Sequence, residues 1–142
     1  SDCDIFISAA AISDYKPSDT LIEKHKSSDG DLNIKLVRGE DILKTAKLKN
    51  KNVFAVGFSA ETKNIEENAK AKLVSKKIDM IIANEANHQK GLGFESDYNQ
   101  IVIINESETT TIPRNSKKEL AKIIIHKIVS IYKKNLLKIK NA

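Results

Sequence analysis

The sequence lacks the residues that stabilise small secreted domains and those that mark membrane helices. It has a single cysteine, Cys3, so no disulfide can form within the chain, and no Cys/His spacing resembles a zinc site. No apolar run is long enough to cross a bilayer. These absences exclude a disulfide-rich scaffold, a zinc domain and a transmembrane helix, and they favour a reducing, cytoplasmic setting.

Aromatic residues are also scarce, at 5% with no tryptophan. The core must therefore rest on Ile, Leu, Val and Ala, which suits helices that cover a sheet. The 142 residues, 40% hydrophobic and 30% charged, fit one ordinary globular domain. The first residues already resemble an interior strand and no initiator Met precedes them, so we expect an excerpt of a longer protein.

Positive charge exceeds negative charge, with 24 Lys and Arg against 19 Asp and Glu and a formal net charge of +5. Such an excess attracts polyanions, which raises the hypothesis of a nucleic-acid-binding module. The aromatic platform that single-strand binders use and every recognisable nucleic-acid motif are absent from the sequence. We therefore expect no nucleic acid partner and no membrane partner.

Short apolar strands alternate with amphipathic helical segments in the first half of the chain. Strands separated by such helices predict right-handed crossovers and a parallel sheet covered on both faces. The expected strands are Asp4–Ser8, Asn33–Val37, Val53–Gly57 and Asp79–Ala83. The first expected helix is Asp41–Lys49. A second helix is expected to begin with a capping box at Asn64 and Glu67 and to bury Ile65, Ala69 and Leu73.

The second half of the chain predicts a different arrangement. Gln100–Ile104 and Thr109–Ile112 flank a polar turn and predict an antiparallel hairpin. Ser116 opens a helix that we expect to end at about Tyr132, with inward-facing Leu120, Ile123, Ile124 and Ile128. The prediction is a three-layer, Rossmann-like α/β fold with a mainly parallel sheet and a C-terminal antiparallel hairpin, as one domain over residues 1–132 and a frayed basic tail over residues 133–142.

In open parallel sheets, ligands bind at the carboxyl ends of the strands, where loops and helix N-termini meet. Three segments occupy such positions, namely Ala9–Asp14, Gly57–Thr62 and Asn84–Ala86. Each carries small or polar residues that a purely structural turn does not need. We therefore expect the site among the loop residues Ser13, Asp14, Ser59, Glu61 and Asn84.

Lysines near these segments are candidates for binding phosphate. Lys72 and Lys76 lie four residues apart and share one helix face, where a bound phosphate would relieve their repulsion. A solvated helix face is the commoner situation for such a pair. Lys24 and Lys26 lie in the long segment 13–28, which we interpret as a flap over a triphosphate or as a solvated loop.

The remaining chemical groups support several interpretations. Asp14 and Glu61 suit a magnesium ion or a ribose hydroxyl, and they suit helix caps equally well. The three histidines, His25, His88 and His126, show no metal-ligand spacing. Cys3, at the start of a strand, is interpreted as a small buried apolar residue and not as a nucleophile.

Five motifs occur together in one order, and together they resemble phosphopantothenoylcysteine synthetase, the phosphopantothenate cysteine ligase of coenzyme A biosynthesis. The resemblance runs from Asp4 to about Tyr132. The motifs are AAISDYKP (10–17), VGFSAET (56–62), DMIIAN (79–84), SDYNQIVII (96–104) and PRNSK (113–117).

The resemblance implies an enzyme that activates the carboxylate of 4'-phosphopantothenate with CTP. Cysteine then attacks the acyl cytidylate, and magnesium accompanies the triphosphate. The resemblance also implies a homodimer, to which the hairpin near Gln100–Ile112 is a plausible contributor. It further implies fusion or association with a flavin-dependent phosphopantothenoylcysteine decarboxylase.

The resemblance also assigns roles to individual residues. Backbone groups of Ser8, Ala9 and Ala10 would meet the cytosine, and Asp14 would hold the nucleotide near its ribose. Lys24 matches the first lysine of a mobile loop that clamps the phosphates, and it is the one residue expected to be catalytic. Glu40, Asp41, Ile42, Leu43 and Phe58 match further nucleotide-contacting positions, and Lys72 and Lys76 match helix lysines that touch the base or its surroundings.

Two departures from the family pattern affect the expected activity. Ser27 stands where the mobile loop usually has its last lysine. The family's N-terminal portion, with a glycine-rich nucleotide loop and an asparagine that supports the acyl intermediate, is absent. The alternative hypothesis is therefore a non-catalytic nucleotide-binding subunit that keeps the same fold.

Overall fold

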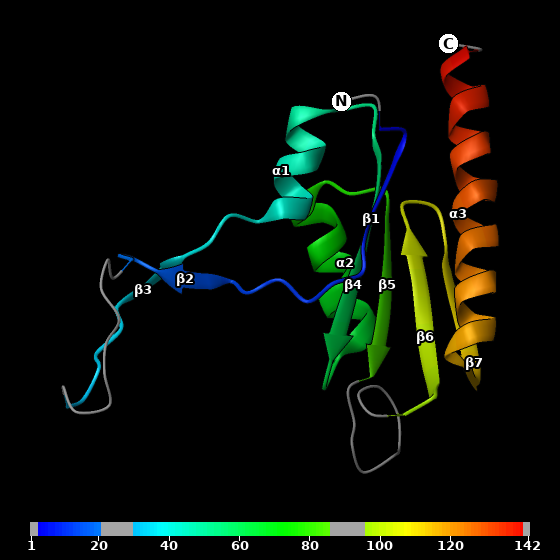
Figure 1. Cartoon of the computed structure of the whole chain (residues 1–142). Coiled ribbons are helices and arrows are strands. Elements are labelled where there is room, and N and C mark those ends of the chain that lie inside the picture. Colours follow the sequence, from blue (N-terminus) through cyan, green and yellow to red (C-terminus); the bar gives the residue numbers. More distant parts are fainter. Residues whose placement is uncertain (1–2, 21–29, 86–95, 141–142) are drawn as a thin grey trace.

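Five strands form a central sheet in the computed structural model, which describes residues 3–20, 30–85 and 96–140 (Figure 1). In spatial order they are β1 (Ile5–Ser8), β4 (Phe54–Glu61), β5 (Met80–Glu85), β6 (Tyr98–Asn105) and β7 (Thr109–Ser116). The first three strands run parallel to one another, and the last two complete an antiparallel hairpin. The predicted fold class and hairpin are therefore confirmed.

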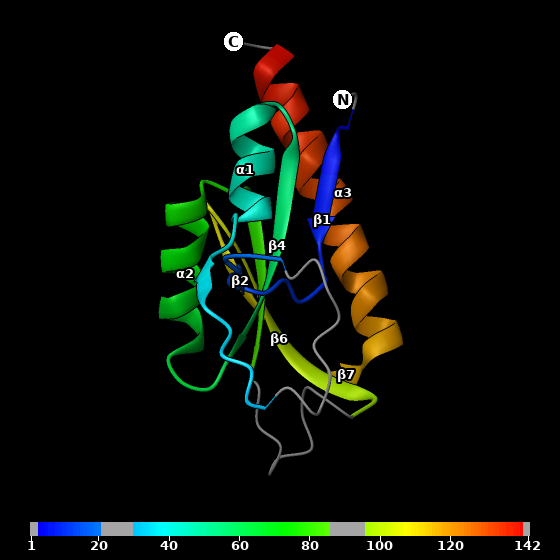
Figure 2. The ribbon, with the colours of Figure 1, turned by 60° about the vertical axis from the view of Figure 1, so that its left-hand side comes forward.

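Three helices complete the layers on either side of this sheet. The helices α1 (Ile42–Lys49) and α2 (Ile65–Lys76) cover one face, and α3 (Lys117–Lys140) covers the other, as Figure 2 shows from the side of the sheet edge. None of the helices in the described part of the chain is both long enough and apolar enough to traverse a lipid bilayer.

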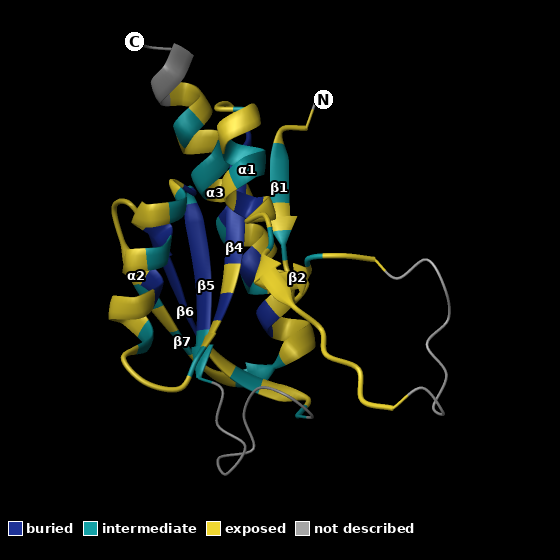
Figure 3. Ribbon diagram, turned by 90° about the vertical axis from the view of Figure 1, so that its left-hand side faces the viewer, coloured by how far each residue is buried: buried dark blue, intermediate teal, exposed yellow. Residues whose placement is uncertain are grey.

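The sequence of β4 and β5 explains why these strands lie at the centre of the sheet. Both begin with unbroken runs of apolar residues and glycine, and these runs are buried (Figure 3). Alternate side chains enter two separate clusters. One cluster joins the sheet to α1 and α2 through Ala55, Ile81, Ala69 and Leu73, and the other joins it to α3 through Val56, Met80, Leu120, Ile124 and Ile128.

Several predicted boundaries are wrong by a few residues. The strand β4 continues to Glu61 and β5 to Glu85, so segments expected as loops after Gly57 and Ala83 remain in the parallel ladder. Polar side chains are tolerated there because the strand ends reach solvent while their backbones stay paired. The helix α3 continues to Lys140, well beyond the expected end at Tyr132. Cys3 is exposed and precedes β1, so its interpretation as a buried residue is also wrong.

The two capping predictions have different outcomes. Ser116 Oγ accepts a hydrogen bond from the Glu119 N–H at 3.2 Å, as expected for the start of α3. Asn64 precedes α2 as predicted, but it adopts a left-handed conformation with φ of 48° and its side chain makes no capping bond. Instead, its backbone carbonyl accepts the Asn68 N–H.

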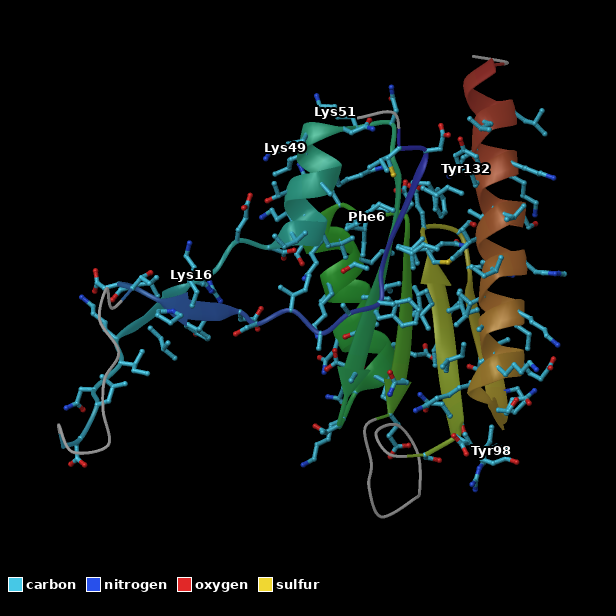
Figure 4. The ribbon with its side chains drawn as sticks, in the orientation of Figure 1. Phe6, Lys16, Lys49, Lys51, Tyr98 and Tyr132 are labelled. Atoms are coloured by element: carbon cyan, nitrogen blue, oxygen red, sulfur yellow. The ribbon has the colours of Figure 1, made fainter. Side chains whose placement is uncertain are left out.

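A two-stranded ribbon extends from the body of the molecule between β1 and α1 (Figure 4). It consists of β2 (Tyr15–Pro17) and β3 (Leu36–Arg38) in antiparallel pairing, and the labelled Lys16 lies on it, away from the sheet. The expected strand Asn33–Val37 overlaps β3 only in part. The segment 13–28, expected as one loop, thus contains the strand β2 near its start. Lys24, Lys26 and Ser27 of that segment lie outside the described residues.

Candidate functional site

A cavity of about 250 Å³ lies at the carboxyl ends of β1 and β4, on the face covered by α1 and α2. We call it the site cavity. The segment after β1, the start of α1, the end of β4 and one side of α2 form its walls. It is lined by Ser8, Ala10, Ala11, Ile12, Ser13, Asp14, Glu40, Asp41, Ile42, Leu43, Phe58, Ser59, Ala60, Lys72 and Lys76.

The predicted nucleotide-binding residues converge on this cavity although they are distant in sequence. Ten of them line it, from Ser8 at the end of β1 to Lys76 on α2. Ala9 lies in a neighbouring cavity on the other face of the sheet. Lys24 lies outside the described residues. The parallel pairing of β1 with β4 explains the convergence, because it brings the ends of both strands to one edge of the sheet.

Lys72 is held in the wall of the cavity by two partners from β4. Its Nζ donates to Ser59 Oγ at 2.8 Å and lies 2.6 Å from Glu61 Oε1. Ser59 Oγ donates to the same carboxylate, which also accepts from Asn68 Nδ2 at 3.2 Å. Ser59 is buried, and this network fixes the ammonium group of Lys72 beside the cavity, although the lysine side chain as a whole is 45% exposed.

Lys76 has a different partner at the start of α1. Its Nζ lies 3.0 Å from one oxygen of Asp41, while the other oxygen of that carboxylate accepts the Lys44 N–H at 3.0 Å. Asp41 is therefore the N-cap of α1 and an anchor for α2 at the same time. The repulsion expected between Lys72 and Lys76 is relieved by two carboxylates.

The electrostatic environment lowers the pKa of both carboxylic acids. For Glu61, partial burial raises the pKa, but hydrogen bonds from Lys72, Ser59 and Asn68 outweigh that effect and leave it below its usual value. For Asp41, burial again raises the pKa. The hydrogen bond from the Lys44 N–H and the ion pair with Lys76 have the larger combined effect, so the pKa of Asp41 is also below its usual value. Both groups are therefore anionic at neutral pH.

The described walls of the cavity carry more carboxylates than lysines. Three carboxylates, from Asp14, Glu40 and Asp41, line it together with two lysines, Lys72 and Lys76. Carboxylates are suited to the hydroxyl groups of a ribose, as in other nucleotide sites at this edge of a parallel sheet. Their oxygen atoms also suit magnesium. Among the described residues, however, no group of three acidic, histidine or cysteine side chains could hold a metal ion by itself.

A second cavity, of about 430 Å³, opens on the opposite face of the sheet, between β1 and α3. Phe58 lines both cavities and so separates them. The walls of the second cavity are mostly apolar, including Ile7, Ile82, Leu120 and Ile125, with polar groups from Asn84, Asn99 and Lys117.

Sequence reasoning missed the way in which Glu61 and Asn68 contribute. Glu61 was expected to hold a metal ion or a ribose hydroxyl, or to cap a helix; its oxygens instead accept hydrogen bonds from Ser59, Lys72 and Asn68, so it is not a helix cap. Asn68 and Lys72 lie four residues apart on α2, a spacing that places both on one helix face. That spacing predicts that Asn68 and Lys72 lie side by side, but it does not reveal that Glu61, at the end of β4, lies beside both of them.

The family model of the DNA/pantothenate metabolism flavoprotein C-terminal domain matches residues 1–132. The chain is 36% identical over 133 residues to the coenzyme A biosynthesis bifunctional protein CoaBC of Haemophilus influenzae. That match covers 93% of this chain and 33% of the relative, so the chain spans about a third of the length of the curated protein.

Solved structures show the same architecture. The crystal structure of the C-terminal domain of CoaBC superposes with a TM-score of 0.71 at 30% identity, over 94% of this chain and 57% of that one. A mutant of Cab2 in complex with phosphopantothenate-cysteine superposes with a TM-score of 0.66 at 18% identity, over 93% of this chain and 45% of that one. At that identity the second match shows the fold alone.

Proposed function

Since the chain belongs to the family of the DNA/pantothenate metabolism flavoprotein C-terminal domain, we propose that it acts in coenzyme A biosynthesis as part of a phosphopantothenoylcysteine synthetase. The reaction joins 4'-phosphopantothenate to cysteine at the expense of CTP. The convergence of ten predicted nucleotide-binding residues on the site cavity is the observation that carries this proposal.

The charges around the site cavity suggest how the nucleotide is oriented. The base and ribose occupy the described cavity, with backbone groups near Ser8 and Ala10 at the base and Asp14 at the ribose hydroxyls. The phosphates lie towards Lys72 and Lys76, the two cationic side chains in the described walls of the cavity. Neutralising a triphosphate takes further positive charge, which Lys24 supplies in this proposal.

Magnesium fits this arrangement as a companion of the triphosphate. It usually keeps several waters and binds through substrate phosphates and one or two carboxylates. With Asp14 at the ribose, Glu40 at the cavity wall would provide such an oxygen. When bound, the ion would offset negative charge on the phosphate oxygens.

The chemistry needs no nucleophilic side chain from the protein. A carboxylate oxygen of 4'-phosphopantothenate attacks the α-phosphorus of CTP, and the bond to pyrophosphate breaks. The cysteine amine then attacks the acyl carbon, loses a proton, and releases CMP. The protein's part is to hold the reactants in line and to stabilise charge on the phosphoryl oxygens.

The second cavity supplies the place for the acyl substrate. Its apolar walls suit the pantothenate chain, and Phe58 is the common boundary with the nucleotide side. The reacting carboxylate would then lie near the end of β1, between the two cavities. We also propose a cytoplasmic homodimer, as in the sequence-based expectation.

Calorimetric titration of CTP tests the nucleotide part of the proposal. Replacing Lys72 by Gln removes a cation beside the cavity, and we expect CTP to bind about 10- to 100-fold more weakly, since a charge-assisted hydrogen bond contributes roughly 1.5–3 kcal/mol. Lys70→Gln is the matched control, because Lys70 lies on the same helix and pairs with Glu66 outside the site cavity. Equal loss in both variants would contradict a specific role for Lys72.

Pyrophosphate release tests the reaction itself. The full-length protein that carries this sequence should release pyrophosphate from CTP only when 4'-phosphopantothenate is present. Lys24→Ala should lower that rate while leaving the unfolding temperature unchanged. Retained CTP binding with no release by the full-length protein would instead support the non-catalytic subunit.

A further inference from the structure

We propose that Asn68 is a positioning residue for the proposed reaction: it holds Glu61, and Glu61 in turn holds the Lys72 ammonium group towards the nucleotide. The inference rests on the proposed function, because it takes Lys72 to meet CTP. Asn68 itself lies outside the described walls of the site cavity. It therefore acts through Lys72 and not by touching a substrate.

The contacts of the Lys72 ammonium group leave one of its N–H donors for a ligand. A lysine ammonium carries three N–H donors and no acceptor. Among the described residues, Ser59 Oγ accepts one of them at 2.8 Å and Glu61 Oε1 accepts another at 2.6 Å. Both acceptors belong to β4, so they fix the direction of the remaining N–H relative to the sheet. Because Lys72 lines the site cavity, that N–H is the one that can reach a ligand there.

This direction depends on where the Glu61 carboxylate lies. Glu61 is the last residue of β4, and its backbone is held in the parallel ladder opposite Glu85 of β5. Its side chain can still rotate, because Lys72 and Ser59 both donate to the same oxygen, Oε1. The other oxygen, Oε2, accepts a hydrogen bond from Asn68 Nδ2 at 3.2 Å. The bond from Asn68 therefore sets the orientation of the carboxylate.

Asn68 is itself anchored through its side chain and its backbone. Its Nδ2 also donates to the Lys63 carbonyl at 3.0 Å, in the connection between β4 and α2. Its backbone N–H donates to the Asn64 carbonyl. On α2, Asn68 precedes Lys72 by one turn, the spacing at which side chains on one helix face are neighbours. The helix, the connection and the strand end are thus joined at one side chain.

The arrangement separates the charge of Lys72 from its position. Asn68→Ala changes neither the charge of Lys72 nor that of Glu61, so the electrostatic attraction for a triphosphate stays about the same. It removes the bond that orients the carboxylate, and the ammonium group can then follow that carboxylate away from the cavity. Misplacing a group at the reacting centre by about 1 Å costs roughly 10²-fold in rate. We therefore expect turnover to fall more than CTP affinity.

The test measures pyrophosphate release and CTP binding by the full-length protein that carries this sequence. In Asn68→Ala we expect kcat to fall about tenfold or more, while the Kd of CTP changes by less than about threefold. The unfolding temperature should not fall, because alanine is the better helix former at this exposed position. Ser75→Ala is the matched control and should change neither constant, since Ser75 is an exposed residue of α2 whose Oγ donates to the backbone carbonyl of Lys72.

Asn68→Asp distinguishes positioning from packing, because aspartate and asparagine have the same shape. The new carboxylate cannot donate to Glu61, and it lies four residues before Lys72, where an acid and a lysine pair on a helix. It should draw the ammonium group away from Ser59. We expect kcat to fall at least as far as in Asn68→Ala, and CTP to bind more weakly because a negative charge has been added.

The acetylation rate of Lys72 reports its position without any nucleotide. Acetic anhydride modifies accessible lysines, and mass spectrometry gives the rate at each of them. In Asn68→Ala, Lys72 should react at least about threefold faster than in the unsubstituted protein, because its ion pair is weakened. Lys76 provides the internal reference, since its partner Asp41 is unchanged.

The possible outcomes separate the role of Asn68 from the proposed function. Equal kcat in Asn68→Ala and Ser75→Ala, or an unchanged acetylation rate at Lys72, would overturn the positioning role alone. So would a parallel loss of kcat, CTP affinity and unfolding temperature in Asn68→Ala, which indicates damaged folding. Failure of the unsubstituted protein to release pyrophosphate from CTP in the presence of 4'-phosphopantothenate would overturn the proposed function, and the role of Asn68 with it.

Discussion

At the scale of single residues, the site depends on carboxylates that hold lysines in place. Lys72 is held by Glu61 and Ser59, and Lys76 by Asp41. Each cation is therefore paired before any ligand arrives, and a phosphate would have to share or replace those partners. Such prior pairing fixes the position of the ammonium groups and limits their attraction for other anions.

The lowered pKa values of Glu61 and Asp41 predict acid sensitivity. A folded-state pKa below the unfolded value contributes stability that is fully present above the unfolded pKa, at about 4, and is lost as the pH falls through the folded pKa. We expect the free energy of unfolding in urea to decrease as the pH falls below about 5. In Glu61→Gln this decrease should be smaller.

Glu66→Gln provides the control for that experiment. Glu66 lies in the first turn of α2, outside the site cavity, and makes an exposed ion pair with Lys70 at 3.6 Å. Its substitution should leave the dependence on pH close to that of the parent chain. Indistinguishable pH dependence in Glu61→Gln and the parent would show that the Glu61 network adds nothing to stability.

At Gly57, the surrounding side chains leave no room for a Cβ atom. A Cβ at this position would lie 2.7 Å from Leu43 Cδ2 and 3.0 Å from Ile78 Cδ1. Gly57→Ala should therefore displace Leu43, a residue of the site cavity, and lower the free energy of unfolding by about 1–3 kcal/mol. Combining it with Leu43→Ala should cost less than the sum of the single changes, and strict additivity would count against the clash.

At the scale of elements, strand and helix identities were predictable, but their ends were less so. The buried runs Phe54–Gly57 and Met80–Ala83 mark β4 and β5 by composition alone. The extension to Glu61 and Glu85 depends on parallel pairing between two distant segments, which a local pattern does not reveal. Likewise, the last turns of α3 are rich in lysine, and helix periodicity there is weaker than in its buried part.

The helix α3 provides a direct comparison between a buried and an exposed apolar position. Ile128 is 1% exposed and Ile125 is 48% exposed on the same helix. Ile128→Ala should lower the free energy of unfolding by about 2–5 kcal/mol, whereas Ile125→Ala in this chain should change it by less than about 0.5 kcal/mol. Similar losses, measured by urea unfolding, would show that α3 does not pack on the sheet as described.

At the scale of the whole molecule, the parallel arrangement of β1, β4 and β5 is what creates a site. It brings the segment after β1, the end of β4 and one side of α2 to one cavity, although Ser8 and Lys76 are far apart in the sequence. The resemblance to the synthetase family predicted which residues line this cavity, because it assigned nucleotide contacts to all of them together. It could not predict the internal ion pairs, which depend on how α1 and α2 pack against the strand ends.

The most direct test of this account is a titration of the isotopically labelled chain with CTP and magnesium, followed by NMR. We predict that the largest shifts occur at the amides of Ser8, Asp14, Asp41, Phe58 and Lys72, which all line one cavity. Shifts that cluster instead around Asn105 and Glu108, at the other end of the sheet, or no shifts at any concentration, would contradict nucleotide binding at this site.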